Sequence, residues 1–224
     1  MVLVSDSDLR RAWIHVNLPG VRVAGRGTYR EFPIEELPSI PIVLDDQCEW
    51  LKRYGSPHND GLHRRDLPRG CYSPEDTEPL AEKENVTLPA DFHRFMTSKG
   101  LQQSVRSATD CYLTSGKTIA KTRAGGRLLY FLSDQQGCVN WYLHIQPGTG
   151  ASVLASDDLF CLEETPGQID FAKHNFTFCA PTFSEFLYRF WIENEIWFAM
   201  NFKEDLRPLK DLELAYVRQY QPGL

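Results

Sequence analysis

The chain has 224 residues, of which 42% are hydrophobic, 12% aromatic and 24% charged. This composition is that of a globular protein and excludes a disordered one, and a chain of this length buries roughly 70–75% of its unfolded surface without a disulfide or metal staple. The 24 basic and 30 acidic residues give a net charge of −6, which argues against general nucleic-acid binding and suits a basic protein partner.

The first residues, Met1 to Asp8, lack the basic segment and the long apolar run of a signal peptide. No run of about 18 apolar residues occurs, so we expect no transmembrane helix and a cytoplasmic protein. The 6 cysteines are widely spaced, unlike a secreted disulfide framework, and we expect them to be reduced.

The N-terminal part of the chain is predicted to contain short elements. Ser5 or Ser7 could cap a helix over residues 9–16. A second short helix is expected to be opened by Asp45 and to end at Gly55.

A stretch rich in proline, glycine and charge, Ser56 to Pro79, reads as loop and is the best candidate for a domain boundary. Within it, Ser73-Pro74-Glu75-Asp76 is a helix-start signature. We therefore expect an N-terminal extension, residues 1–79, packed on a main domain, residues 80–224.

The main domain is predicted to begin with a helix that starts at Leu88-Pro89-Ala90-Asp91 and stops at Gly100. Strands are then expected at residues 109–114, 127–133, 138–145, 152–154 and 176–179. Because short hairpin turns such as Ser133 to Gly137 join neighbouring strands, the sheet should be antiparallel.

Two helices are predicted in the last part of the sequence. Thr182 followed by Glu185 has capping-box spacing, and the aromatic residues after it should anchor the core. A terminal helix is expected over residues 208–220. The order of elements predicts an α+β fold with a central antiparallel sheet flanked by helices.

The sequence contains no complete motif for catalysis. Ser115-Gly116-Lys117-Thr118 resembles the end of a phosphate-binding loop, but Cys111 stands where that motif needs a glycine. Glu193 and Glu195 are two apart on a helix, so they should not face one site. We expect Glu193 on the solvated edge and Glu195 either capping or pairing with a neighbouring strand. We therefore predict no catalytic residues and no cofactor.

A metal site is the alternative. Cys48, His58, His63 and Cys71 fall in one stretch, and the spacing of the two histidines is one that zinc ligands use. The arginines after His63 disfavour a bound cation, and solvated histidines with a buried Cys48 are the ordinary interpretation.

Trp141 and Tyr142 are neighbours on one expected strand, so their side chains should point to opposite faces of the sheet. One of them should enter the core, and the other could lie on the outer face as an anchor for a partner. The alternative is that a helix covers both.

Three segments resemble the SUKH superfamily, which includes the fungal cell-wall assembly regulators. Leu88 to Gly100 is similar to the family's LP-x-D-[FY] helix, and Leu129 to Gly137 to its strand with an Asp-x-x-Gly turn. Ala180 to Leu187 is similar to its late A-x-S-F-x-E-F-L helix start. The three occur in the family's order over about residues 80–224.

The resemblance implies an α+β domain that acts by binding, as in bacterial immunity proteins that neutralise toxins, many of them nucleases, by occlusion. The alternatives are a metal-dependent enzyme using the Cys48–Cys71 loop, and an interaction module within a larger complex. We expect a protein partner, such as a basic toxin domain, and neither nucleic acid nor membrane. The candidate contact residues are Asp134, Gln135, Gln136, Trp141, Tyr142, Glu193 and Glu195.

Overall fold

The longest helix begins where the sequence provides its cap. In the computed structural model, which describes residues 9–18, 28–62, 73–148, 150–160 and 168–220, the Thr182 hydroxyl accepts a hydrogen bond from the backbone N–H of Glu185 at 3.2 Å. This bond satisfies one of the N–H groups that the first turn of a helix leaves open. Helix α5 then runs over Phe183–Asn201, so the helix start predicted at Thr182 is confirmed.

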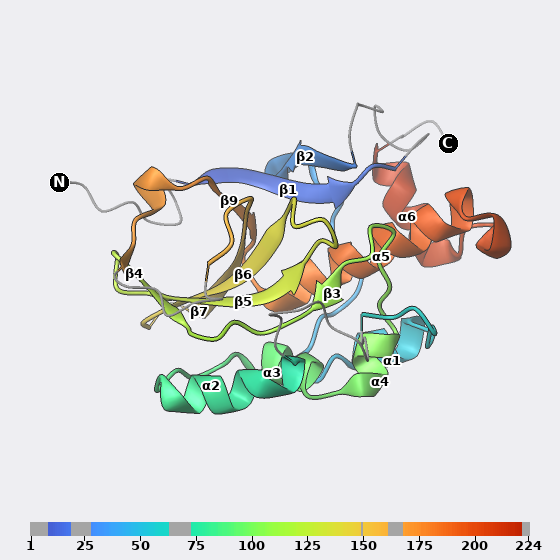
Figure 1. Cartoon of the computed structure of the whole chain (residues 1–224). Helices are drawn as coiled ribbons and strands as arrows, with labels where there is room; N and C mark the ends of the chain where they lie inside the picture. Colours follow the sequence, from blue (N-terminus) through green and yellow to red (C-terminus); the bar gives the residue numbers. More distant parts are fainter. Residues whose placement is uncertain (1–8, 19–27, 63–72, 149, 161–167, 221–224) are drawn as a thin grey trace.

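Helix α5 packs against β1, β7 and β9 of the sheet. Figure 1 shows α1 to α4 grouped below the curved sheet, with α5 extending from the sheet toward α6. The helices are α1 (Glu49–Tyr54), α2 (Thr77–Lys83), α3 (Ala90–Met96), α4 (Lys99–Gln103), α5 (Phe183–Asn201) and α6 (Asp211–Tyr220), and the 3-10 turns are η2 (Ile34–Glu36), η3 (Pro74–Asp76), η4 (Phe171–Lys173) and η5 (Lys203–Asp205).

The described strands form one sheet in the order β2-β1-β9-β7-β6-β5-β4-β8, with β3 also paired to β5. Most pairs are antiparallel; β1–β9 and β4–β8 are parallel, so the sheet is mixed. The predicted α+β class is confirmed. The strands are β1 (Arg10–Val16), β2 (Tyr29–Pro33), β3 (Tyr112–Leu113), β4 (Ala120–Thr122), β5 (Arg127–Ser133), β6 (Asn140–Gln146), β7 (Gly150–Ser156), β8 (Gln168–Ile169) and β9 (Phe176–Ala180).

Buried side chains form two clusters, because successive residues of a strand point to opposite faces of the sheet. On β5, Phe131 belongs to the larger cluster, with α3 and α5, and Tyr130 belongs to the smaller one. The larger cluster also includes Trp13 and Trp50, which lie before residue 80. The described parts of the N-terminal segment therefore share a core with the rest of the chain.

Two expectations about local structure are wrong. Residues 10–16 form β1, not a helix, and β1 pairs with β2 on one side and with β9 on the other. Trp13 and Val16 have high strand propensity, and the hydrogen bonds to two neighbouring strands outweigh any helix cap. Gly100 does not stop α3, which ends at Met96; it lies inside α4.

The glycine of the β5–β6 hairpin does have the predicted role. Gly137 adopts a φ of 70°, a conformation that residues with a Cβ rarely reach. Its backbone N–H donates to the carbonyl of Asp134 at 2.9 Å, which closes the turn. The antiparallel hairpin predicted between the two strands is confirmed.

A membrane-spanning helix would have to be both long and apolar. None of the helices in the described ranges combines these two properties.

Candidate functional site

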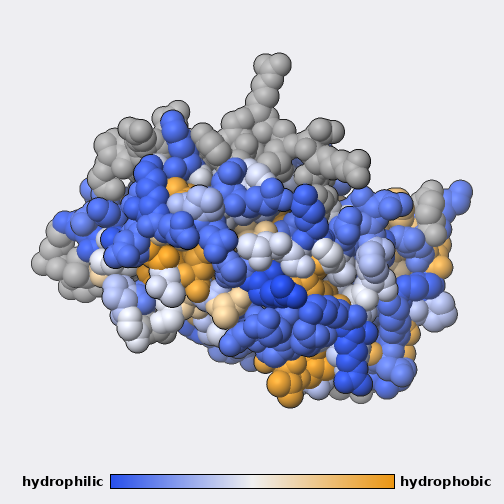
Figure 2. Space-filling view, turned by 90° about the horizontal axis from the view of Figure 1, so that it is seen from below, coloured by the Kyte–Doolittle hydropathy of each residue, from blue (hydrophilic) through white to orange (hydrophobic). Residues whose placement is uncertain are grey.

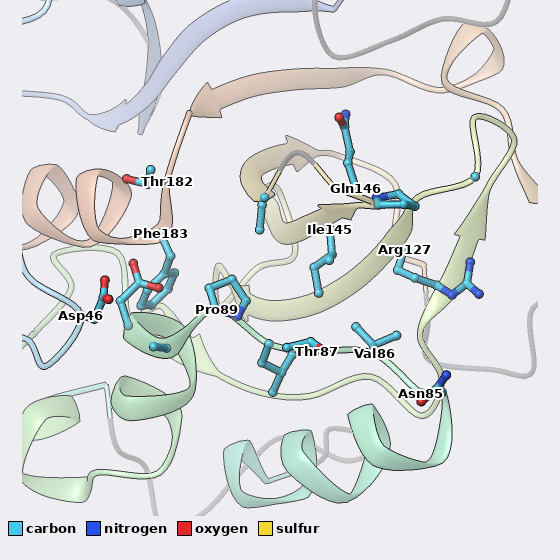
Figure 3. A pocket seen from close by; sticks show the side chains of 18 residues that line it. Asp46, Asn85, Val86, Thr87, Pro89, Arg127, Ile145, Gln146, Thr182 and Phe183 are labelled. Atoms are coloured by element: carbon cyan, nitrogen blue, oxygen red, sulfur yellow. The ribbon is translucent and has the colours of Figure 1, made fainter.

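A groove of about 640 Å³ lies at one end of the sheet. It lies between the segment that joins α2 to α3, the β6–β7 turn and the first turn of α5 (Figure 3). We call it the end groove. Its lining residues are Asp46, Asn85, Val86, Thr87, Leu88, Pro89, Ala90, Asp91, Gly125, Arg127, Ile145, Gln146, Pro147, Gly148, Gly150, Ala151, Thr182 and Phe183.

The end groove has an apolar middle and charged ends. Ile145, Val86 and Pro89 lie between Asp46, on the side of α5, and Arg127, on the side of Asn85 (Figure 3). Its volume is within the range of about 300–1,000 Å³ that is common for ligand pockets. A site of this kind can hold an apolar ligand and orient it by charge.

One wall of the end groove is fixed by a buried carboxylate. Asp91, at the start of α3, accepts hydrogen bonds from the backbone N–H of Ser184 at 2.9 Å and from its hydroxyl at 2.6 Å. The other oxygen of Asp91 accepts from the N–H of Phe92. Both carboxylate oxygens are therefore occupied, and Asp91 joins the start of α3 to the start of α5.

Of the candidate contact residues in the β5–β6 turn, two are exposed and one is buried. Gln135 and Gln136 are exposed, whereas Asp134 is buried. Asp134 accepts from the backbone N–H groups of Gln136 and Cys138 and from the hydroxyl of Tyr29. Asp134 is thus a structural residue of the turn, and a partner can reach only the two glutamines.

Both strand aromatics are covered, as in the second of the two expectations, although a helix covers only Trp141. Trp141 and Tyr142 do point to opposite faces, since they belong to different clusters, but they are only 1% and 0% exposed. Trp141 packs against Phe190 of α5. Tyr142 packs against Phe160 and Phe176 on the other face. Neither side chain is available as a surface anchor, because both faces of the sheet are covered.

Glu193 does not lie on a solvated edge, contrary to expectation. It is 1% exposed, and its two oxygens accept hydrogen bonds from the indole of Trp13 at 2.9 Å and the hydroxyl of Tyr216 at 2.8 Å. Because burying a carboxylate is costly unless it is hydrogen-bonded, these contacts hold Glu193 in the core. Glu193 therefore joins β1, α5 and α6.

Glu195 is paired, but with side chains outside the strands and not with a neighbouring strand, and its network is separate from that of Glu193. It lies 3.0 Å from the Nε of Arg106 and 3.2 Å from the Nε2 of His58, and Arg106 also contacts Asp205. Burial would raise the pKa of Glu195, but the hydrogen bonds and positive charges of His58 and Arg106 lower it below its ordinary value. The two glutamates thus have different partners, and they do not form an acid–base pair.

The stretch proposed for metal binding is only partly described. Cys48 is buried, and desolvation raises the pKa of its thiol to about 12, which disfavours the thiolate that binds metals. His58 faces Glu195. His63 and Cys71 lie outside the described residues. Within the described ranges, no three histidine, cysteine or acidic side chains are grouped as metal ligands.

The sequence alone does not predict the end groove. Asp46, Arg127 and Phe183 come from distant parts of the chain, and no motif or spacing connects them. The signal that the sequence did contain was the Leu88-Pro89-Ala90-Asp91 helix start, which forms one wall of the groove.

Comparison of the chain with protein-family models, with curated proteins and with solved structures finds no match.

Proposed function

We propose that the chain is a non-enzymatic protein-binding domain of the SUKH type. In this proposal it is an immunity or defence-associated protein that neutralises a toxin domain by covering the surface on which the toxin acts. A basic nuclease is the toxin class that a chain of net charge −6 suits best. We place its action in the cytoplasm, where such a toxin would meet its substrate.

The observation that carries the proposal is the contact between Asp91 and Ser184. The two residues belong to two of the three segments in which the sequence resembles the family. Their hydrogen bonds, at 2.9 and 2.6 Å, join the helix starts of these segments within one core. This arrangement supports a structural role for the shared residues, as expected for a family that works by surface and shape.

The acidic residues of the surface also support a basic partner. Exposed carboxylates lie on η2 and α2 at Glu36 and Glu82. Three others pair within the chain: Glu35 with Arg11, Glu49 with Lys52 and Glu78 with His93. Figure 2 shows a mostly hydrophilic face that is interrupted by separate hydrophobic areas. A surface of this kind can steer a basic partner by long-range attraction.

Co-expression with the product of the neighbouring gene tests the proposal. If that product is a toxin, the chain should restore growth and should co-purify with the toxin. A chain that binds none of its neighbours' products would contradict the proposal.

A further inference from the structure

A small cavity, which we call the α5 cavity, lies between the sheet and α5. Residues of β1, β2, β6 and α5 line it, together with Thr109. The centre of a water molecule can occupy about 10 Å³ of this space. One buried water molecule needs about 10–15 Å³ of such space, so the cavity has room for a single water and not for a larger ligand.

The wall of the α5 cavity contains a buried hydrogen-bond donor. Trp141 of β6 lines the cavity and is 1% exposed. Its indole Nε1 has no hydrogen-bond partner among the described residues. Buried polar groups of folded proteins are nearly always bonded to the protein or to ordered water. The indole therefore favours a ligand that accepts a hydrogen bond.

The same wall offers acceptors for the protons of a ligand. Asn194 of α5 lines the cavity and is 4% exposed. Its Oδ1 accepts a hydrogen bond from the backbone N–H of Ala108 at 2.7 Å, and an amide oxygen can accept two. Glu193 and Thr109, whose side chains carry oxygen acceptors, also line the cavity. A ligand in this place meets both a donor and several acceptors.

These groups distinguish water from other small ligands. The indole of Trp141 needs a ligand with a lone pair, and the acceptors need a ligand with protons. Water has both, whereas a metal cation has no lone pair and would face the N–H of the indole. Buried waters typically make about three hydrogen bonds, and Trp141, Asn194 and Glu193 provide groups for them.

We propose that the α5 cavity binds one water molecule, which accepts a hydrogen bond from Trp141 and donates to Asn194 and Glu193. The site lies where two hydrogen-bond networks meet. Tyr29, which lines the cavity, donates to Asp134 of the β5–β6 turn at 2.8 Å. Glu193 joins β1, α5 and α6. The bound water connects these networks and fastens the sheet to α5, and it does not depend on the proposed function.

Nuclear magnetic resonance tests the site at the indole proton of Trp141. Triple-resonance assignment identifies the signal of this proton, and Trp141→Phe should remove it. NOESY and ROESY spectra of the isotope-labelled full chain should each show a cross-peak between the indole proton and water, with opposite signs in the two experiments. Opposite signs identify a water molecule that stays bound, because proton exchange with the solvent gives the same sign in both.

Protein hydroxyl groups can imitate this signal, since their protons exchange with water. Tyr29→Phe/Thr109→Val removes both hydroxyls from the wall of the cavity, and Thr109→Val alone is the milder variant. The cross-peaks should persist in each variant whose amide spectrum shows a folded chain. Absence of the cross-peaks in the unmodified chain, equal signs in the two experiments, or loss of the cross-peaks together with the hydroxyls would overturn the water site.

Discussion

The hydroxyl of Tyr29 donates a hydrogen bond to the carboxylate of Asp134 at 2.8 Å, joining β2 to the β5–β6 turn across 105 positions of sequence. The same hydroxyl lies 2.8 Å from that of Thr109 and 3.4 Å from the thiol of Cys111. Burial raises the pKa of Tyr29, so the phenol stays protonated and remains a donor. This contact ties an N-terminal strand to the turn that carries the two exposed glutamines.

Removing the hydroxyl should destabilise the protein. Tyr29→Phe leaves a buried carboxylate oxygen without its donor, and we expect a loss of about 1–3 kcal/mol in the free energy of unfolding. Urea denaturation measures it. Tyr54→Phe is the control, since the Tyr54 hydroxyl makes no hydrogen bond among the described residues. Equal stability of the two variants would show that the Tyr29 contact is not formed.

The contact between Asp91 and Ser184 can be measured with a double-mutant cycle. Asp91→Asn and Ser184→Ala should each lower stability by about 1–2 kcal/mol, and the double variant by less than the sum, because both remove parts of one contact. Asp46→Asn applies the same chemical change to an exposed carboxylate and should stay within about 0.5 kcal/mol of the unmodified chain. If the losses of the two single variants add up exactly to the loss of the double variant, Asp91 and Ser184 do not interact.

The network around Glu195 predicts a pH dependence. The pKa of Glu195 is lowered in the folded state, so its contribution is present above the unfolded pKa of about 4.3 and is lost as the pH falls through the folded value. At neutral pH, Glu195→Gln should lower the free energy of unfolding by about 3 kcal/mol, because it leaves buried cationic partners without the negative charge that they face. The difference in free energy of unfolding between the unmodified chain and Glu195→Gln should become smaller below about pH 4. Urea denaturation at a series of pH values measures it. A difference in free energy of unfolding that does not change with pH would show that the ionised Glu195 does not stabilise the fold.

Variants of the candidate contact residues should separate core from surface. Trp141→Ala removes a fully buried ring and should cost about 3–5 kcal/mol of stability. Gln135→Arg/Gln136→Arg changes two exposed side chains and should leave the unfolding midpoint unchanged. A basic toxin should bind the arginine variant less tightly if it contacts this turn, and calorimetric titration measures that affinity. An unfolding midpoint that falls in the arginine variant would mean that these side chains are not free surface.

Sequence patterns predicted the elements whose signals are local. The cap at Thr182, the turn glycine Gly137 and the serine cap at Ser73 each act within a few residues, and the structure contains all three. The strand β5 was predicted with its observed bounds because Gly125-Gly126 and the turn after Ser133 delimit an apolar run. Local hydrogen bonding and backbone conformation were enough for these predictions.

The errors concern residues whose environment is set at long range. Glu193 was expected in solvent because a carboxylate is usually exposed, but its partners Trp13 and Tyr216 come from opposite ends of the chain. The strand β1 was predicted as a helix because the sequence does not show its pairing with β2 or with β9, which lies more than 160 residues away. The end groove was not predicted for the same reason, because its walls come from several distant segments.

In the proposed function, the chain acts by occupying a partner and not by chemistry. Calorimetric titration of the toxin domain with the chain, followed in parallel by the toxin's activity, tests this most directly. If the chain acts by binding alone, the complex should have a fixed stoichiometry, the toxin's activity should fall in proportion to the chain added, and the toxin should regain full activity when the complex is separated. Inactivation by a small fraction of an equivalent, or toxin recovered in a chemically altered form, would contradict it.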